Sequence, residues 1–325
     1  MVEILKLAHS LHQSLVHMFY DLASLTKPLV TAPLVLKYLD LDLDWRGRLK
    51  VDWPGQLTPR HLLSHAAGLP PWLPYIGKPI IEQITAFSGW RRHPLLKESV
   101  WGESTYSDLS YRLLAEMLQI ETGQDWSSLG KTLTALEYHP WSESPISMPP
   151  GEDRDAWKLA TSKPFPEPKA DFSHDANARA GMLGHAGFGA TVESARDFLH
   201  VWVPEFSKRM AVETNYSKDG QIWGLGLQRL KNGNNGFVEV LNKTARRGIK
   251  VISYDGMAEP PLISPHFPTD PSNWWFHTGY TGTVLFVRPE DLACVMILCH
   301  RLKENGTLMT AEELRARRMQ ILKLS

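Results

Sequence analysis

The period of the apolar pattern changes along this chain, and that change constrains the fold more than any other feature. Up to about residue 189 the patterned segments have helical spacing, whereas from Gln221 onward they have the alternation and the turn residues of short strands. Strands that are grouped in one part of a sequence do not form alternating βαβ units. The order therefore predicts an α+β fold in which helices flank an antiparallel sheet.

The expected elements follow from this pattern. Helical segments are expected at 1–19, 22–39, 59–65, 107–122 and 310–324. Strands are expected at 222–230, 250–254, 274–277, 282–287 and 292–299. Pro33 should bend the second helix, and the proline-rich stretch 140–171 should form a long irregular wall or lid. We expect 1–50 and 190–325 to form a sheet domain and 51–189 a mostly helical domain, with the active site between them.

Composition excludes several classes of protein. The 325 residues are 43% hydrophobic, which is too apolar for a disordered chain. Lys plus Arg and Asp plus Glu number 35 each, so there is no basic excess to bind a nucleic acid or an acidic membrane surface. The longest apolar run, 292–299, is far shorter than the roughly 18 residues that a membrane-spanning helix needs.

The cysteines and the first residues of the chain indicate the cellular compartment in which the protein is expected. Cys294 and Cys299 cannot build a disulfide framework, and their odd spacing puts them on opposite faces of one strand. The first residues lack the pattern of a signal peptide. A cytoplasmic location is therefore expected of the chain as written, and a periplasmic or exported one if its true start lies further upstream.

Ser24 and Lys27 stand three residues apart at the start of the second predicted helix. This spacing puts both side chains on one helix face, where a lysine could take the proton of a serine hydroxyl. The free N–H groups of a helix start could also bind an anion that forms on a substrate. The pair alone is weak evidence, because Ser128 and Lys131 repeat the same spacing.

Four further motifs follow in order. They are Leu62-Leu63-Ser64-His65-Ala66-Ala67-Gly68-Leu69-Pro70, Tyr106-Ser107-Asp108, Gly184-His185-Ala186-Gly187 and His277-Thr278-Gly279-Tyr280. With Ser24-Leu25-Thr26-Lys27 they resemble the serine β-lactamase and penicillin-binding-protein superfamily, most closely its class C and esterase-like branch. The resemblance runs from Phe19 to the C-terminus and implies a β-lactamase/transpeptidase-like fold.

The resemblance also implies a role for each matched position. Ser24 would be the acylated nucleophile, Lys27 its base partner and Tyr106 the group that shuttles protons between nucleophile and leaving group. Asp108 would stand where relatives often have Asn. The remaining substrate-binding positions would be His277, Thr278 and Gly279, which match a Lys-Thr-Gly strand motif, and Tyr280, whose backbone N–H would join that of Ser24 in an oxyanion hole.

These roles describe a serine hydrolase that forms an acyl-enzyme on an ester, amide or β-lactam carbonyl of a small-molecule or peptide substrate, with no cofactor and no metal. Two departures from the family pattern favour an esterase or a D-amino-acid peptidase over an efficient β-lactamase. His277 carries only part of the charge of the lysine found in relatives. An ionised Asp108 would raise the pKa of Lys27 and oppose its action as a neutral base.

A third departure concerns the sheet. Relatives begin with a helix and two strands, whereas the 23 residues before Ser24 have a helical pattern. The N-terminal strands of the sheet are therefore expected to be missing, which would leave the strand 292–299 with a bare edge. The N-terminal helix could cover that edge, a second copy could pair with it in a homodimer, or the chain could lack its true start.

The sequence also allows other interpretations. Asp108 could cap the helix 107–122 instead of binding substrate. His65 and His185 belong to motifs that shape loops in relatives, and His61 and His65 have a spacing that could hold a metal, although no third ligand follows. The whole chain could also be a catalytically impaired binding or regulatory protein with a β-lactamase fold.

Overall fold

The computed structural model describes residues 18–72, 80, 82–83, 101–133, 175, 178, 184–216, 221–230, 235–244, 248–254, 273–303 and 305–324. Of the predicted N-terminal helix, residues 1–17 lie outside the described residues, and Met18 and Phe19 are not helical. The predicted wall or lid at 140–171 also lies outside them.

A five-stranded sheet has the strand order β3-β5-β6-β7-β4. Its strands are β3 (Gln228–Arg229), β4 (Ile249–Tyr254), β5 (Trp275–Thr278), β6 (Val284–Arg288) and β7 (Ala293–Cys299). The pairs β3–β5, β5–β6 and β6–β7 are antiparallel, whereas β4 and β7 are parallel. The prediction of a wholly antiparallel sheet is therefore wrong at one pair. The strand expected at 222–230 is shorter than predicted and is reduced to β3.

Strand β7 has a neighbour on both edges. It pairs with β6 on one side and with β4 on the other, from Ile249 opposite Cys294 to Tyr254 opposite Cys299. The bare edge predicted for this strand is therefore wrong, because a segment of the same chain fills it. The homodimer suggested through that edge has no support from this sheet, since the backbone groups of β7 are already paired.

The two faces of the sheet belong to two hydrophobic clusters. Cys294, Met296 and Leu298 lie in the larger cluster, and the alternate residues Val295, Ile297 and Cys299 lie in the smaller one. The two cysteines are thus on opposite faces, as predicted, and both are free thiols. This alternation follows from the two-residue period of side chains along a strand.

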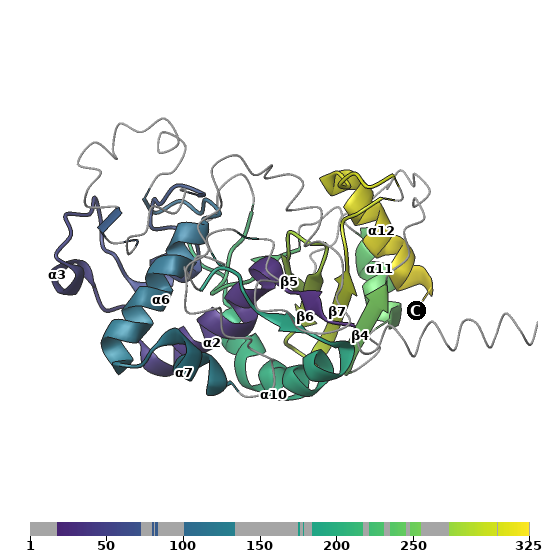
Figure 1. Cartoon of the computed structure of the whole chain (residues 1–325), viewed down its shortest axis with the longest axis horizontal. Coiled ribbons are helices and arrows are strands. Elements are labelled where there is room, and N and C mark those ends of the chain that lie inside the picture. The colour runs from purple at the N-terminus through teal and green to yellow at the C-terminus, as the bar shows by residue number, and fades with distance from the viewer. Residues whose placement is uncertain are drawn as a thin grey trace, which may run out of the picture.

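Helices cover both faces of the sheet (Figure 1). Helix α10 (Val192–Met210) contacts β4 and β6, and α11 (Asn235–Thr244) packs against α12 (Ala311–Leu324) over the other face. The capping pattern expected for α12 is present, since Glu313 N–H donates to Thr310 Oγ1 and Thr310 N–H to a Glu313 carboxylate oxygen. Neither α10 nor α11 was predicted from the sequence.

The remaining elements lie in the first part of the chain. They are β1 (Tyr20–Asp21), η1 (Ala23–Leu25), η2 (Lys27–Thr31), α2 (Ala32–Tyr38), α3 (Arg46–Leu49), α4 (Pro59–Leu63), α6 (Asp108–Thr122), α7 (Trp126–Lys131) and β2 (Gly189–Ala190). The helices expected at 59–65 and 107–122 are confirmed as α4 and α6. Among the described residues, no helix has both the length and the apolar character that crossing a membrane requires.

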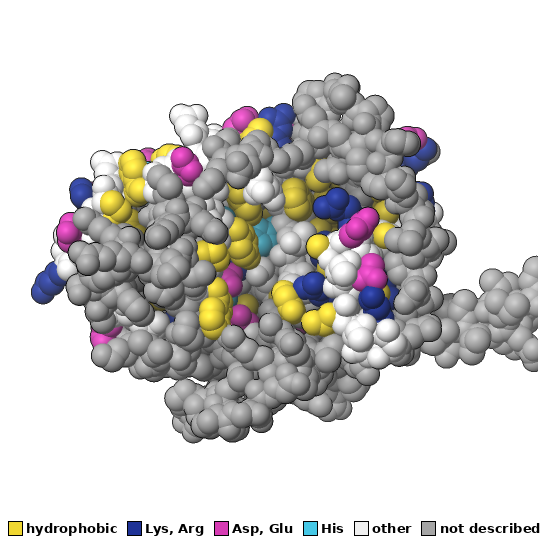
Figure 2. All heavy atoms as spheres, turned by 90° about the horizontal axis from the view of Figure 1, so that it is seen from above, with side chains coloured by type: hydrophobic (Ala, Val, Ile, Leu, Met, Phe, Trp, Pro, Cys, Tyr) yellow, Lys and Arg dark blue, Asp and Glu magenta, His cyan; other side chains and the backbone are white. Residues whose placement is uncertain are grey.

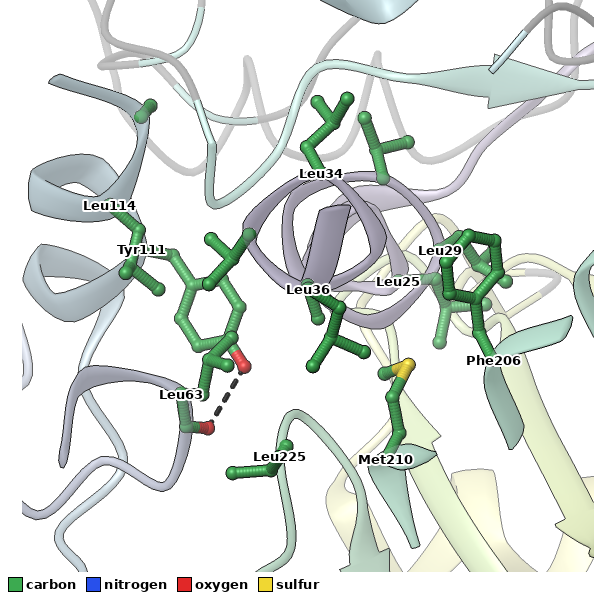
Figure 3. Packing of buried hydrophobic residues seen from close by; sticks show 14 of the residues in the cluster. Leu25, Leu29, Leu34, Leu36, Leu63, Tyr111, Leu114, Phe206, Met210 and Leu225 are labelled. Atoms are coloured by element: carbon green, nitrogen blue, oxygen red, sulfur yellow. Dashed lines mark hydrogen bonds between the residues drawn. The ribbon is translucent and has the colours of Figure 1, made fainter. Parts of the chain in front are cut away.

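The helical run η1–η2–α2 lies between α6 and the sheet with α10 (Figure 1). Leu25, Leu29 and Leu36 of this run are buried in the larger cluster. Figure 3 shows them between Tyr111 of α6, whose hydroxyl donates to the Leu63 carbonyl at 3.0 Å, and residues of α10 such as Phe206. The predicted nucleophile therefore stands at the start of a buried helical run.

Candidate active site

The helical run that carries Ser24 and Lys27 changes its type along its length. It begins as a 3-10 turn at Ala23–Leu25, continues as a π-helix at Lys27–Thr31, and becomes α-helical at Ala32. Pro33 has no N–H to donate and its ring would crowd the carbonyl of Leu29 in a regular α-helix. The wider π turn before it accommodates both constraints, so the bend predicted at Pro33 takes the form of a change in helix type.

Ala23, directly before Ser24, has a positive φ of 50°. An L-residue with a side chain adopts this conformation only when its surroundings hold it there. The Asp21 carboxylate accepts a hydrogen bond of 2.8 Å from the Ala23 N–H. Asp21 therefore helps to hold the sharp turn that leads into the predicted nucleophile.

Lys27 is completely buried, and oxygen atoms of several residues lie against its ammonium group. Lys27 Nζ donates to Ser24 Oγ at 2.9 Å and to the His185 carbonyl at 2.9 Å, and lies 2.7 Å from Asp108 Oδ1. The structure thus brings together Ser24, Lys27 and Asp108 as the sequence motifs predicted. It adds the His185 carbonyl, which carries no sequence signal because every residue has one.

Asp108 is the first residue of α6 and does not cap it. Ser107 is the N-cap, and its hydroxyl accepts from the Ser110 N–H at 3.4 Å. The alternative that Asp108 caps this helix is therefore wrong. The side chain of Asp108 is left to reach Lys27, and it remains 19% exposed.

The surroundings of Lys27 determine its charge. Burial lowers the pKa of Lys27, because a low-dielectric interior disfavours an ammonium group, but the negative charge of Asp108 and the contact with Tyr106 raise it. The net pKa lies above the ordinary value of 10.5. Lys27 is therefore an ammonium ion at neutral pH, which agrees with the predicted effect of Asp108.

Tyr106 lies in an aromatic group beside Lys27. Its ring centroid is 5.1 Å from Lys27 Nζ, 4.7 Å from the ring of His65 and 6.0 Å from that of Trp223. Although 37% of Tyr106 is exposed, desolvation of its phenol raises its pKa above 10, and interactions with Lys27 and Ser24 offset this only in part. Tyr106 therefore keeps its proton at neutral pH.

His277 completes this aromatic group from the sheet side. Its ring lies 5.9 Å from that of Tyr106 and 6.2 Å from that of Trp223. Burial and the positive charge of Lys27 lower the pKa of His277 to about 3, so the imidazole is neutral at neutral pH. Figure 2 shows that hydrophobic side chains border a hollow on this face of the molecule, with a histidine at its bottom.

The neutral imidazole of His277 has a defined tautomer. Its Nδ1 lies 3.0 Å from the Thr278 carbonyl, which can only accept, so Nδ1 carries the proton. Its Nε2 is buried and has no hydrogen-bond partner among the described residues. The predicted partial charge at His277 is therefore not available to bind a carboxylate.

The other predicted substrate-binding residues lie at the end of β5 and in the turn after it. Thr278 is exposed, Gly279 is buried and Tyr280 is half-buried. A side chain at Gly279 would meet Thr283 Oγ1 at 2.1 Å and the Leu22 carbonyl at 2.7 Å, so only glycine allows this turn to approach the segment before Ser24.

Two threonines tie this turn to the same segment, and sequence reasoning missed both. Thr281 Oγ1 donates to the Asp21 carbonyl at 2.7 Å, and Thr283 Oγ1 to the Leu22 carbonyl at 3.3 Å. Both threonines are buried. They hold the Tyr280 backbone at a set position relative to Ser24, and their place directly after the His277 motif was the one available signal.

Asp175 and His185 extend the polar network. His185 Nε2 lies 3.0 Å from Asp175 Oδ1, and His185 is buried. Asp108, Asp175 and His185 each offer one ligand atom, and these atoms lie within 4.8 Å of one another, a spacing that could hold a metal ion. Because the Lys27 ammonium already lies against Asp108, we interpret these side chains as a polar network beside the ion pair of Lys27 and Asp108.

Comparisons with known proteins agree with this geometry. The sequence family described as Beta-lactamase matches residues 17–319. A class C beta-lactamase from Rhodobacter sphaeroides has a similar structure, at 16% identity and a TM-score of 0.55, covering 94% of this chain and 86% of that one. A beta-lactamase/D-alanine carboxypeptidase from Pseudomonas syringae is similar at 14% identity and a TM-score of 0.52, covering 94% and 84%.

A penicillin-binding protein from Bacillus halodurans also has a similar structure, at 14% identity and a TM-score of 0.50, covering 94% of this chain and 86% of that one. At these identities the structural likeness shows the fold alone. A search of curated protein sequences gave no significant match. The match to the family extends over nearly the whole sequence, and the chain therefore belongs to the beta-lactamase family.

Proposed function

We propose that this protein is a serine hydrolase that forms an acyl-enzyme at Ser24 on an ester, amide or β-lactam carbonyl. The observation that carries the proposal is the 2.9 Å hydrogen bond from Lys27 Nζ to Ser24 Oγ inside a buried polar network. A cation at this distance stabilises negative charge that develops on the serine oxygen during attack. Tyr106 lies beside the same cation and can pass a proton to the leaving group.

The backbone N–H groups of Ser24 and Tyr280 would stabilise the oxyanion in this proposal. The close approach of the β5–β6 turn to Leu22 and Ala23 supports it, since this approach places the two backbone segments side by side. Donors held in advance by the protein cost no reorganisation during the reaction. The bonds from Thr281 and Thr283 would supply that preorganisation.

An ester, or a D-amino-acid peptide whose C-terminal carboxyl group is blocked, fits the site better than a β-lactam that must be hydrolysed efficiently. Penicillins and peptides with a free C-terminus carry a carboxylate, and a lysine in the place of His277 would offer that carboxylate a full positive charge. The neutral imidazole offers none. Substrates without this carboxylate should therefore acylate Ser24 faster than carboxylate-bearing ones.

A second candidate function follows from the charge of Lys27. Because Asp108 keeps Lys27 protonated, Lys27 by itself is poorly suited to accept the Ser24 proton. A chain of this family with such a site could bind ligands without turning them over. It would then be a binding or regulatory protein.

Covalent labelling distinguishes the two functions. Folded protein should be incubated with a fluorophosphonate, a p-nitrophenyl ester and a fluorescent penicillin, and the adduct mapped by mass spectrometry. The hydrolase predicts an adduct on the peptide that contains Ser24 and its absence from Ser24→Ala. No adduct at Ser24 with any of the three reagents, together with ligand-induced thermal stabilisation that survives Ser24→Ala, would instead establish the binding protein.

A further inference from the structure

Oxygen atoms of several groups surround the Lys27 ammonium, which has no atom that can accept a proton. An ammonium group has three N–H donors and no acceptor. Ser24 Oγ, the His185 carbonyl and Asp108 Oδ1 lie 2.7–2.9 Å from Lys27 Nζ. Lys27 is completely buried, so water does not compete for these donors. In this state Lys27 can donate protons but cannot accept the Ser24 proton unless it first gives one away.

The groups that face Lys27 differ in their ability to take that proton. Tyr106 already holds its proton, because its pKa is raised. His65 is buried, its pKa is well below 6.5, and its Nδ1 accepts from the Ser107 N–H at 3.1 Å. The Nε2 atom of His277 carries no proton and could accept one, but the pKa of about 3 makes this imidazole a weak base.

The carboxylate of Asp175 lies 3.0 Å from His185 Nε2, and its ligand atom lies within 4.8 Å of that of Asp108. The carboxylate of Asp108 lies directly against Lys27 Nζ at 2.7 Å. Among the described residues around Lys27, Asp108 is therefore the base with the shortest proton path. Resting on the proposed function, we propose that Asp108 is the final acceptor of the Ser24 proton during acylation, with Lys27 as the relay between them.

Attack by Ser24 moves two protons at the same time. Ser24 Oγ forms a bond to the substrate carbonyl carbon, and the π electrons of that carbonyl move onto its oxygen. The Ser24 proton passes to Lys27 Nζ while Lys27 gives a different proton to Asp108 Oδ1. Lys27 stays an ammonium ion that faces the new oxyanion, and Asp108 becomes a neutral carboxylic acid. When the bond to the leaving group breaks, the oxyanion electrons re-form the carbonyl double bond and the leaving group keeps the electron pair of the broken bond. Tyr106 gives its proton to the leaving group and takes one from Lys27, and Asp108 returns its proton to Lys27.

The test is the pH dependence of Ser24 labelling by a fluorophosphonate, measured by intact mass. This reagent reports formation of the Ser24 bond without a deacylation step, and its fluoride leaving group needs no proton. In Asp108→Asn, Lys27 must lose its proton before it can accept one. We expect the acid limb of the rate profile, which is the fall in labelling rate at low pH, to move up by about 2 pH units. The rate at pH 7 should fall by about 100-fold.

Two further variants complete the experiment. Asp108→Glu keeps a carboxylate and should keep the acid limb at the wild-type position with a lower rate. Asp125→Asn changes an exposed aspartate that caps α7 and should leave both rate and profile unchanged. If Asp108→Asn does not fold, Asp108→Glu decides the question, since an upward shift of its acid limb would overturn the proposal.

The outcomes separate this inference from the proposed function. Wild-type protein that is labelled at Ser24, with an acid limb that stays in place in Asp108→Asn, overturns the relay and leaves the hydrolase intact. Under that result Asp108 would only anchor substrate, and the variant would weaken binding without shifting the profile. Wild-type protein that is never labelled at Ser24 overturns both.

Discussion

Two segments of this chain have the same Ser-x-x-Lys spacing and very different surroundings. Ser24 and Lys27 lie in the central helical run, where Lys27 is fully buried against Asp108 and the His185 carbonyl. Ser128 lies in the short helix α7, is exposed, and its N–H donates to Asp125 at 2.7 Å, three residues away. Spacing alone therefore sets only which helix face two residues share. Partners far away in the sequence supply the chemistry.

The largest expected difference between the two segments concerns their lysines. Lys27→Met should lower the rate of Ser24 labelling by about 1,000-fold, because the cation beside the hydroxyl is lost. It should also lower the free energy of unfolding by about 2 kcal/mol, because a largely buried Asp108 carboxylate is left without its partner. Urea denaturation measures the second effect.

Lys131→Met is the matched change in the second segment and should alter neither quantity appreciably. Lys27→Met combined with Asp108→Asn should recover part of the lost stability, because the unpaired charge is then removed. A Lys27→Met protein as stable and as reactive as wild type would show that the two segments do not differ in the way we describe.

A smaller effect is expected at the threonines. Thr281→Val removes the hydroxyl that holds the β5–β6 turn against Asp21, 260 residues away. Acylation by an oxygen ester should slow about tenfold, in line with one lost hydrogen bond and a displaced oxyanion donor. The matching thionoester, whose sulfur gains little from N–H donors, should slow much less.

The matched control is Thr132→Val. Thr132 Oγ1 donates to the Leu129 carbonyl at 2.7 Å, a local bond at the end of α7. Thr281→Ser should restore the oxygen-ester rate. Equal slowing of the ester and the thionoester in Thr281→Val would argue against a role in holding the oxyanion donor.

The smallest effect is the contribution of His277 to the pH dependence of stability between pH 6 and pH 5. The pKa of His277 in the folded protein is about 3, below its ordinary value of 6.5. Between these values the unfolded chain binds the proton and the folded protein does not. The neutral imidazole of His277 therefore contributes to the free energy of unfolding above pH 6.5. This contribution is lost as the pH falls toward 3, by about 1 kcal/mol per pH unit.

In His277→Gln, the free energy of unfolding should fall by about 1 kcal/mol less than in wild type between pH 6 and pH 5. Part of the slope should remain, because the pKa of buried His65 is also lowered. His200→Gln changes an exposed histidine of α10 and should leave the slope as in wild type. Urea denaturation at several pH values checks this, and an unchanged slope in His277→Gln would contradict a neutral, buried imidazole.

Much of the fold could be predicted from periodicity. The limits of α6, β5, β6, β7 and α12 agree with the sequence pattern to within about two residues, since local spacing and caps specify them. The prediction was wrong about the edge of β7. It assumed that only an N-terminal strand could pair with β7, whereas β4 does so. A strand was expected at 250–254, but nothing in that sequence says which neighbouring strand it pairs with.

The candidate site, like the fold, could be predicted only in part. The motifs identified Ser24, Lys27, Tyr106, Asp108 and His277, and the structure gathers these residues around one ammonium group and one aromatic group. The sequence could not identify the His185 carbonyl or the Thr281 bond to Asp21. Backbone acceptors have no residue signature, and their position depends on how distant segments pack.

The sequence by itself determined the helices α4, α6 and α12, the strands β4 to β7, and the helix face that Ser24 and Lys27 share, because these depend on neighbours a few residues away. Only the tertiary structure decided that β4 fills the edge of β7, that Lys27 is an ammonium ion and that His277 is neutral. Strand pairing and charge both depend on groups brought together from distant parts of the chain, since burial and nearby charges set the pKa of each group.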